Sequence, residues 1–254
     1  MTNLFDIQGK KAIVTGGTRG LGYGMAEGLM EAGAEVVIVG TSDKVMSVAS
    51  DFCARGFKCH GVKADLSKRD QTFKCFDDCL EALGGDLDIL VTAHGIQRRH
   101  SAEVFPENDW NEVIEVNLNS VFFLCQKAAN VMLKKGYGKI VTIASMVSWF
   151  GGQTVPAYSA AKGGVTQLTK ELSNDWIARG INVNSIAPGY MATEMNKALL
   201  DKSNPRYQQI TDRIPAHRWG TGDDMKGAVI FLSSHASDYL GGAIIPVDGG
   251  YLVK

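Results

Sequence analysis

The fold of this chain is decided by one glycine-rich stretch, Thr15-Gly16-Gly17-Thr18-Arg19-Gly20-Leu21-Gly22. It follows a short apolar run at 12–14 and precedes a segment of helical periodicity from about Leu21 to Ala32. The spacing GxxxGxG removes the side chains that would block a sharp turn and the close approach of a diphosphate to a helix start. Free backbone N–H groups and the helix dipole favour negative charge there. We interpret the stretch as a dinucleotide-binding loop, the alternative being an ordinary glycine-rich turn.

Outward from this loop, short apolar runs alternate with longer segments of helical periodicity. The helical segments begin near residues 20, 45, 66, 107 and 156. The apolar runs, typical of buried strands, are 12–14, 36–39, 57–62, 89–91, 139–143, 181–186 and 243–247. Parallel strands need crossover helices, which then cover both faces of the sheet. We therefore predict an α/β fold of the Rossmann type, a doubly wound parallel sheet in a single domain, residues 1–254.

Length and composition agree with a folded protein whose partner is a small molecule. The 254 residues can bury a large core, and 45% hydrophobic with 21% charged residues is typical of a globular chain. A formal net charge of -1 offers no field to attract nucleic acid or a membrane surface. No stretch has the apolar length of a membrane span or signal peptide, so we expect a cytoplasmic protein. The five cysteines match no metal-ligand spacing, so we expect reduced thiols and no metal site.

A phenol and an ammonium lie four residues apart in Tyr158-Ser159-Ala160-Ala161-Lys162, hence on one face of a helix. The cation would lower the pKa of the phenol towards working pH, as proton exchange requires, although a YxxxK pair is also common on solvated helices. Ser145 follows the strand at 139–143, where its hydroxyl could orient a carbonyl towards the phenol. Asn117 lies in a helical stretch, where its amide could hold a water beside Lys162 or simply face solvent.

The tip of the second strand bears on the choice of nicotinamide nucleotide. It reads Gly40-Thr41-Ser42, without the carboxylate that would bind the ribose hydroxyls and repel a 2'-phosphate. Asp43 falls further along, where Ser42 or Asp43 is more simply a helix cap. Thr41, Ser42 and the guanidinium of Arg19 could together hold a 2'-phosphate, so we favour NADP over NAD. The alternative is that Arg19 faces solvent.

Taken together, these motifs resemble the short-chain dehydrogenase/reductase family over essentially the whole chain. By that resemblance Tyr158 is the general acid/base, and Lys162 binds the nicotinamide ribose and tunes Tyr158. Ser145 would position the substrate carbonyl, and Asn117 would anchor a proton relay. The implied reaction is direct hydride transfer between the nicotinamide and a carbon bearing oxygen, with Tyr158 exchanging the proton and no metal taking part.

The resemblance also implies a set of cofactor contacts. The glycine loop would hold the diphosphate, Asp65 and Leu66 would flank the adenine, and residues 188–193 would cover the nicotinamide. The predicted contacts are Gly16, Thr18, Arg19, Gly20, Leu21, Gly22, Thr41, Ser42, Asp65, Leu66, Ala93, Gly95, Tyr158, Lys162, Pro188, Gly189, Met191 and Thr193. The chain departs from the family where Thr92-Ala93-His94-Gly95 replaces Asn-Asn-Ala-Gly after the fourth strand. We interpret His94 as a structural substitution, not a catalyst.

Two basic segments, 95–100 and 213–220, lie near the predicted active edge of the sheet. They favour a cationic pocket for a sugar acid, since guanidinium binds carboxylate in bidentate fashion, but they could also face solvent or a second subunit. The predicted substrate contacts are Arg99, Ser145, Gln153, Tyr158 and Tyr190. With neighbouring segments they resemble one subgroup, the 2-dehydro-3-deoxy-D-gluconate 5-dehydrogenases, with gluconate 5-dehydrogenases close to it.

Several alternatives stay open at the level of the sequence. A 3-oxoacyl thioester reductase of lipid synthesis would use the same site, and a non-catalytic nucleotide-sensing protein would keep the cofactor fold. The irregular stretch at about 188–215 is interpreted as a substrate lid. The resemblance implies a homotetramer with interfaces on the helices around 107–135 and 156–179 and on the carboxyl-terminal segment, although apolar helix faces also fit burial within one subunit.

Overall fold

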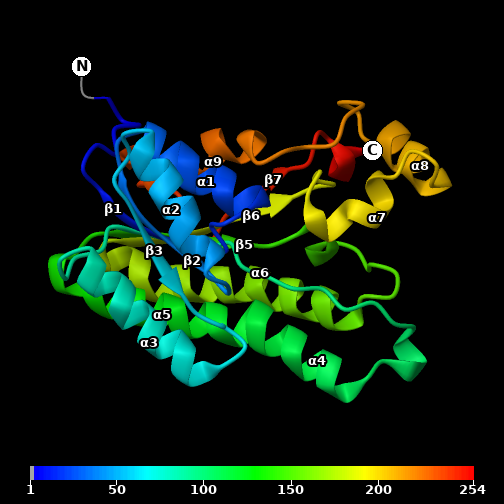
Figure 1. Cartoon of the computed structure of the whole chain (residues 1–254), viewed down its shortest axis with the longest axis horizontal. Coiled ribbons are helices and arrows are strands. Elements are labelled where there is room, and N and C mark those ends of the chain that lie inside the picture. The colour runs from blue at the N-terminus through cyan, green and yellow to red at the C-terminus, as the bar shows by residue number, and fades with distance from the viewer. Residues whose placement is uncertain (1–2) are drawn as a thin grey trace.

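The computed structural model describes residues 3–254, which contain one seven-stranded sheet (Figure 1). The strands are β1 Lys11–Thr15, β2 Glu35–Gly40, β3 Cys59–Lys63, β4 Ile89–Thr92, β5 Gly138–Ile143, β6 Ile181–Pro188 and β7 Ile244–Val247. They lie in the order β3-β2-β1-β4-β5-β6-β7, and every neighbouring pair is parallel. The predicted doubly wound parallel sheet is thus confirmed.

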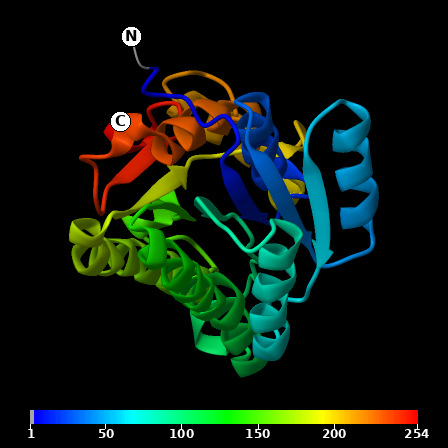
Figure 2. The ribbon, with the colours of Figure 1, turned by 90° about the vertical axis from the view of Figure 1, so that its left-hand side faces the viewer.

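Helices cover both faces of this sheet, as the crossover rule requires (Figures 1 and 2). They are α1 Gly20–Glu31, α2 Lys44–Ala54, α3 Arg69–Ala82, α4 Glu107–Ile114, α5 Ser120–Lys135, α6 Pro156–Trp176, α7 Lys197–Leu200, α8 Pro205–Arg213 and α9 Lys226–Ser233. One apolar cluster joins α1, α2 and α9 to the sheet, and a second joins α3, α5 and α6. Within residues 3–254, no helix is long and apolar enough to cross a membrane.

The inner strands β1, β2 and β4 are apolar over most of their length because both of their faces are buried, whereas the edge strands β3 and β7 are partly exposed. In β2, Val36 and Ile38 pack into the cluster with α1, while Val37 and Val39 pack into the cluster with α3. This alternation follows from the two-residue period of a strand. It explains why the apolar runs predict the strands to within two residues at each end.

The carboxyl ends of the central strands form one level edge. Thr15 lies opposite Thr92, Thr92 lies opposite Thr142, and Thr142 lies opposite Ser185. These four side chains are buried and polar, in contrast to the apolar strands behind them. The edge therefore brings together the segments that follow β1, β4, β5 and β6, which carry most of the predicted site.

The segment at 188–215 is not the irregular stretch that the sequence predicts. It contains the short helix α7 and the two-and-a-half-turn helix α8, which lie together at the carboxyl edge of the sheet (Figure 1). Asn204 caps α8, because its side-chain oxygen accepts a hydrogen bond from the backbone N–H of Arg206 at 3.0 Å. The helices are short and α8 is polar, so their periodicity is weak in the sequence. Lid motion in this segment stays a prediction.

Candidate active site

The glycine loop has the tight geometry that its sequence predicts. Gly16 and Gly20 have φ of +68° and +57°, in the left-handed region that favours glycine. A methyl group on Gly16 would lie 2.9 Å from the carbonyl oxygen of Ala93, and one on Gly22 would collide with the carbonyl oxygen of Gly16. The loop is therefore pressed against the end of β4, and its backbone can approach a diphosphate at the start of α1.

The tip of β2 differs from expectation in one respect. Neither Ser42 nor Asp43 caps α2 with its side chain. Instead the Asp43 carboxylate pairs with Lys63 Nζ at 2.8 Å, because Lys63 ends the neighbouring strand β3 opposite Gly40. The ammonium of Lys63 lowers the pKa of Asp43 and offsets its negative charge. Thr41, Ser42 and Arg19 are exposed around this pair, free to meet a ligand.

The predicted adenine contacts serve the fold as well. Asp65 accepts hydrogen bonds from the backbone N–H of Ser67 at 3.0 Å and from its hydroxyl at 2.7 Å, which shapes the turn after β3. Leu66 is buried in the cluster with α3. Asp65 is half-buried, so part of its surface faces outward at the same sheet edge as the glycine loop. A groove lined by Ser67, Lys68, Asn111, Glu112 and Glu115 lies beyond it.

Helix α6 and the end of β5 bring the predicted catalytic residues together. Tyr158 is half-buried in the first turn of α6, and Lys162 lies one turn later with its Nζ 5.7 Å from the centre of the Tyr158 ring. Ser145 follows β5, and its hydroxyl faces the phenol closely enough to lower its pKa. The hydroxyls of Thr142 on β5 and Thr169 on α6 are 2.7 Å apart and hold the helix on the strand.

The electrostatics of the phenol are not those that the YxxxK spacing predicts. Burial raises the pKa of Tyr158, while the Ser145 hydroxyl and the Arg99 guanidinium oppose that rise and Lys162 is not among its causes. Lys162 Nζ donates instead to the carbonyl oxygen of Ile143 at 2.7 Å. Burial also lowers the pKa of Lys162 to about 8. The cation that bears on the phenol in this structure is Arg99.

Asn117 is held more firmly than a relay residue on a helix surface would be. It is fully buried in a π-helical turn, Glu115–Asn119, that joins α4 to α5. Its Oδ1 accepts from the backbone N–H of Ile96 at 2.9 Å, and its Nδ2 donates to the carbonyl oxygen of Ile96 at 2.8 Å. A methyl group on Gly95 would lie 3.1 Å from Asn117 Oδ1 and 4.0 Å from Lys162 Nζ. The side chain thus fixes the segment after β4 beside Lys162.

His94, which departs from the family pattern, joins β1 to the start of α5. Its Nδ1 lies 2.6 Å from Thr15 Oγ1, and its Nε2 lies 2.7 Å from Ser120 Oγ. Because the Ser120 hydroxyl donates to the carbonyl oxygen of Val116 at 2.7 Å, Nε2 must carry the proton and Nδ1 must accept from Thr15. Burial, and secondly the charge of Lys162, lower the pKa of His94 to about 3. It is therefore a neutral structural link.

The segment after β6 bends over the glycine loop. Gly189 donates its N–H to the carbonyl oxygen of Val247 at 3.0 Å, which ties the segment to the end of β7. Thr193 reaches Gly20, where an added methyl group would lie 3.4 Å from Thr193 Cγ2. Met191 is buried, and its side chain lies against Gly220. Pro188 to Thr193 therefore run from the end of β6 to the glycine loop, and the Met191 side chain packs against Gly220.

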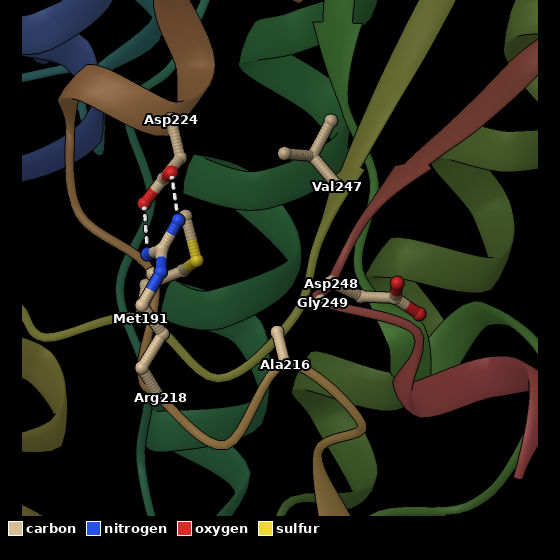
Figure 3. A pocket seen from close by; sticks show the side chains of 8 residues that line it. Met191, Ala216, Arg218, Asp224, Val247, Asp248 and Gly249 are labelled. Carbon is tan, nitrogen blue, oxygen red and sulfur yellow. Dashed lines mark hydrogen bonds and ion pairs between the residues drawn. The ribbon is translucent and has the colours of Figure 1, made fainter.

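A small cavity of about 70 Å³ lies behind this segment (Figure 3). Its lining residues are Met191, Ala216, Arg218, Gly220, Asp224, Val247, Asp248 and Gly249. The two charged groups that face each other there already form a bidentate ion pair, with Arg218 nitrogens 2.8 and 2.6 Å from the Asp224 oxygens. Asp224 also accepts from the backbone N–H of Thr221 at 2.8 Å, and Arg218 also donates to the carbonyl oxygen of Trp219 at 3.3 Å. None of the predicted catalytic residues lines this cavity, so it is separate from the site of the chemistry.

The basic residues of the two predicted pocket segments differ in whether they already have a partner in the structure. Arg98 pairs with Glu112 at 2.7 Å, and the His100 ring lies 2.6 Å from an Asp109 oxygen, so both are anchored on α4. Arg218 is held by Asp224, and the Arg213 guanidinium lies 4.2 Å above the ring of Tyr251. Arg99 and the exposed His217 have neither an acidic nor an aromatic partner within residues 3–254.

The other two predicted substrate residues, Tyr190 and Gln153, differ in how far they are buried. Tyr190 is half-buried in an aromatic group, with its ring centre 5.3 Å from that of Trp219 and 5.2 Å from that of Tyr251. Gln153 is exposed on the loop before α6, beside Thr154, whose φ of +63° is unusual for a branched residue. The sequence did not single out Arg206, on α8, whose positive charge helps to lower the pKa of Arg99. No spacing in the sequence relates these two residues.

The side chains and backbone at this sheet edge fit a nicotinamide dinucleotide, because several of their hydrogen-bond donors have no partner within residues 3–254. Lys162 is 3% exposed and has three N–H donors, of which only the one to Ile143 has a partner within residues 3–254. A buried ammonium with free donors needs acceptor oxygens, and ribose hydroxyls would supply them. At the other end, the open backbone of the glycine loop suits a diphosphate. Lys162 would therefore hold ribose hydroxyls and the glycine loop the diphosphate, while the other predicted cofactor contacts stay predictions.

The fold and this Ser-Tyr-Lys arrangement define an oxidoreductase of the short-chain dehydrogenase class, and comparison with known proteins agrees. A family model for short chain dehydrogenase matches residues 10–204, and the chain belongs to this family, as the motifs predict. A 2-dehydro-3-deoxy-D-gluconate 5-dehydrogenase from Bacillus subtilis (strain 168) is 43% identical over 254 residues, which cover 98% of this chain and 97% of the relative.

Two further relatives are similar over their whole length. A 5-keto-D-gluconate 5-reductase from Escherichia coli (strain K12) is 37% identical, with 100% of this chain and 99% of the relative covered. A crystal structure of a gluconate 5-dehydrogenase from Burkholderia cenocepacia J2315, in complex with NADP and tartrate, has a TM-score of 0.94 at 40% identity. That match covers 99% of this chain and 98% of the other.

Proposed function

We propose that this protein is an NADP-dependent oxidoreductase that interconverts a keto group and a secondary alcohol on a sugar acid of the 2-dehydro-3-deoxy-D-gluconate or gluconate type. The observation that carries the proposal is the Tyr158 phenol one helical turn from Lys162, with the Ser145 hydroxyl and the Arg99 charge both lowering its pKa. The phenol supports proton transfer to a substrate oxygen, and the arginine supports affinity for a carboxylate. Relatives named for gluconate-type substrates support the same substrate class.

Tyr158 is assigned the proton transfer. Burial raises the pKa of its phenol, so Tyr158 is protonated near neutrality and can donate its proton to the oxygen of a carbonyl under reduction. Ser145 would hold that oxygen in line with the phenol. Lys162, with its pKa lowered to about 8, changes charge near neutrality and can pass a proton towards the site. NADPH, when bound, supplies the hydride.

Preference for NADP over NAD is supported by the charges at the tip of β2. The carboxylate of Asp43, which would otherwise repel a 2'-phosphate, is paired with Lys63. Arg19 at the start of α1 and the hydroxyls of Thr41 and Ser42 are exposed nearby. Guanidinium and hydroxyl groups bind phosphate oxygens by charge-assisted hydrogen bonds. The site therefore favours the phosphorylated cofactor.

The assembly and setting follow as further parts of this proposal. We infer a single domain over residues 1–254, a lid at 188–215, and a cytoplasmic homotetramer. Phe122 and Phe123 are only half-buried on α5, and Val253 is 88% exposed near the carboxyl terminus, so both expected interfaces present apolar surface. Sedimentation velocity of the purified chain tests the oligomer, since a monomer at micromolar concentration would contradict it.

A substrate panel tests the proposal. The purified chain is assayed with 2-dehydro-3-deoxy-D-gluconate, D-gluconate and 5-dehydro-D-gluconate, each with the NAD and NADP couples in parallel. Turnover of at least one sugar acid, faster with NADP, is expected. Turnover of acetoacetyl-CoA alone would favour a thioester reductase, and cofactor binding without any turnover would favour a nucleotide-sensing protein. Either result would overturn the proposal.

The role of Tyr158 has its own test. Tyr158→Phe removes the proton donor and keeps the ring, so kcat is expected to fall by about 10²- to 10⁴-fold, the usual worth of a general acid. Tyr239→Phe is the matched control, because Tyr239 is fully exposed and its hydroxyl has no role in the site. Activity that persists in Tyr158→Phe would contradict the assigned mechanism whichever substrate is used.

A further inference from the structure

The last residues of the chain contact both ends of the lid segment, 188–215. At the beginning of this segment, the backbone N–H of Gly189 donates to the carbonyl oxygen of Val247 at 3.0 Å. Directly after its end, the backbone N–H of Ala216 donates to the carbonyl oxygen of Gly249 at 3.0 Å. The end of β7 and the turn that follows it therefore hold the lid segment at both of its ends.

The turn after β7 has a fixed shape. The carboxylate of Asp248 accepts from the backbone N–H of Gly250 at 2.8 Å and from that of Leu252 at 2.9 Å. Gly249 and Gly250 have φ of +65° and +88°, which glycine adopts without steric strain. The turn directs Tyr251 into the protein, where this residue is only 5% exposed.

The ring of Tyr251 contacts a residue from each end of the lid segment. Its centre lies 5.2 Å from the ring centre of Tyr190, which follows β6, and 4.2 Å from the guanidinium carbon of Arg213, at the end of α8. The carboxyl terminus lies beside α8 (Figure 1), where Lys254 Nζ donates to the carbonyl oxygen of Asp212 at 2.8 Å. Aromatic pairs and a cation over an aromatic face are both stabilising, so one ring joins the two ends of the segment.

Tyr251 also belongs to a third apolar cluster, separate from the two that pack on the sheet. This cluster includes Ile210 of α8 and Met146, the residue directly after Ser145. Phe150, on the loop between β5 and α6, packs on it with its ring centre 6.0 Å from that of Tyr251. Tyr251 therefore connects the lid helix α8 to the segment that carries the proposed carbonyl-binding hydroxyl.

We propose that Tyr251 is a positioning residue, which holds both ends of the lid segment in place and so sets the affinity for the sugar acid. This inference rests on the proposed function and adds to it a role for the carboxyl-terminal turn. Without the ring, Tyr190 keeps only Trp219 as an aromatic neighbour within residues 3–254, and Arg213 loses its aromatic partner. A smaller fraction of the molecules would then have the lid segment in place, and the apparent affinity for substrate falls with that fraction.

Limited proteolysis tests the position of the lid segment without turnover. Trypsin cuts after lysine and arginine, and the lid segment offers Lys197, Lys202, Arg206 and Arg213. Tyr251→Leu removes the ring and keeps an apolar side chain. Cleavage within the lid segment is expected to accelerate about tenfold in this variant, while cleavage at the exposed Arg179 changes by less than about twofold. Tyr251→Phe keeps the ring and should match the unmodified chain. Tyr239→Leu, the same substitution at a fully exposed tyrosine, is the control.

Steady-state kinetics with 5-dehydro-D-gluconate and NADPH gives a second readout. In Tyr251→Leu, KM for the acid is expected to rise about tenfold, with kcat and KM for NADPH within about twofold of the unmodified chain.

Unchanged cleavage of the lid segment, or equal acceleration at Arg179, would overturn the inference. So would an unchanged KM for the acid in Tyr251→Leu, or losses in Tyr251→Phe as large as those in Tyr251→Leu. Each of these results would leave the proposed function standing if the unmodified chain turns over a sugar acid. No turnover of any sugar acid by the unmodified chain would instead defeat the proposed function, and cleavage of the lid segment would then decide the positioning role of Tyr251 by itself.

Discussion

The buried His94 should make this protein lose stability in mild acid. Its ring accepts from Thr15 and donates to Ser120, so a second proton on Nδ1 would break the bond from Thr15 and place a charge beside Lys162. Folding lowers the pKa of His94 from 6.5 to about 3. Below pH 6.5 the His94 ring therefore binds a proton in the unfolded chain but not in the folded chain. The free energy of unfolding decreases as the pH is lowered.

The size of this effect follows from proton linkage. Between pH 7 and pH 5 the unfolded chain gains about 2 kcal/mol from protonation of His94, at about 1.4 kcal/mol for each pH unit below 6.5. The full effect, reached near the folded-state pKa, is about 5 kcal/mol. The value at pH 5 is nearly the same for any folded-state pKa below about 4, so the assay measures burial of the ring.

Urea unfolding at pH 7 and pH 5 measures the effect, with protein concentration held constant. His94→Gln keeps a donor and an acceptor but cannot titrate, so it should lose about 2 kcal/mol less than the unmodified chain over this range. His217→Gln, at an exposed histidine, is the control and should change nothing. If His94→Gln unfolds too readily, an NMR titration of the unmodified chain gives the same answer. A His94 signal that shifts between pH 7 and pH 5, or equal pH dependence in both chains, would refute the assignment.

Two further predictions concern binding and catalysis. Arg19→Gln should raise KM for NADP by about 10- to 100-fold and leave KM for NAD nearly unchanged, because only the 2'-phosphate loses a charged partner; Arg179→Gln is the surface control, and equal effects on both cofactors would exclude a phosphate contact. Arg99→Gln should move the pH at which alcohol oxidation accelerates upward, since the Arg99 charge lowers the pKa of Tyr158 and its removal lets burial raise that pKa further. An unchanged pH profile of kcat/KM would show that Arg99 does not act on the phenol.

Local spacing predicts the strands, the glycine loop and the YxxxK helix because each depends on residues close in sequence. Gly16 and Gly20 need positive φ whatever surrounds them, and Tyr158 and Lys162 share a face of any helix that contains both. Local spacing does not predict which group a charged side chain contacts when several lie within reach in the folded protein. It predicts that Lys162 lowers the pKa of Tyr158, whereas burial raises that pKa and the ammonium donates one of its hydrogen bonds to the carbonyl of Ile143.

The contacts of His94 are likewise not predictable from the sequence. The sequence identifies it as a departure from the family pattern, but its role depends on Thr15 and Ser120, which only the packed sheet and helix bring to its two nitrogens. The lid helices are missed for a related reason. α7 and α8 are too short for a clear period, and α8 is fixed by the stacking of Tyr207 on Trp219.

The sequence by itself determined the doubly wound sheet, the family and the residues proposed for proton and hydride transfer, because strand burial and helix period are local properties. Only the tertiary structure decided which arginines are free. Arg98 and Arg99 are alike as residues and adjacent in the chain, yet Arg98 pairs with Glu112 while Arg99 has no acidic partner within residues 3–254. The electrostatic energy of a charge depends on distances across the fold, and those distances exist only after the chain has packed.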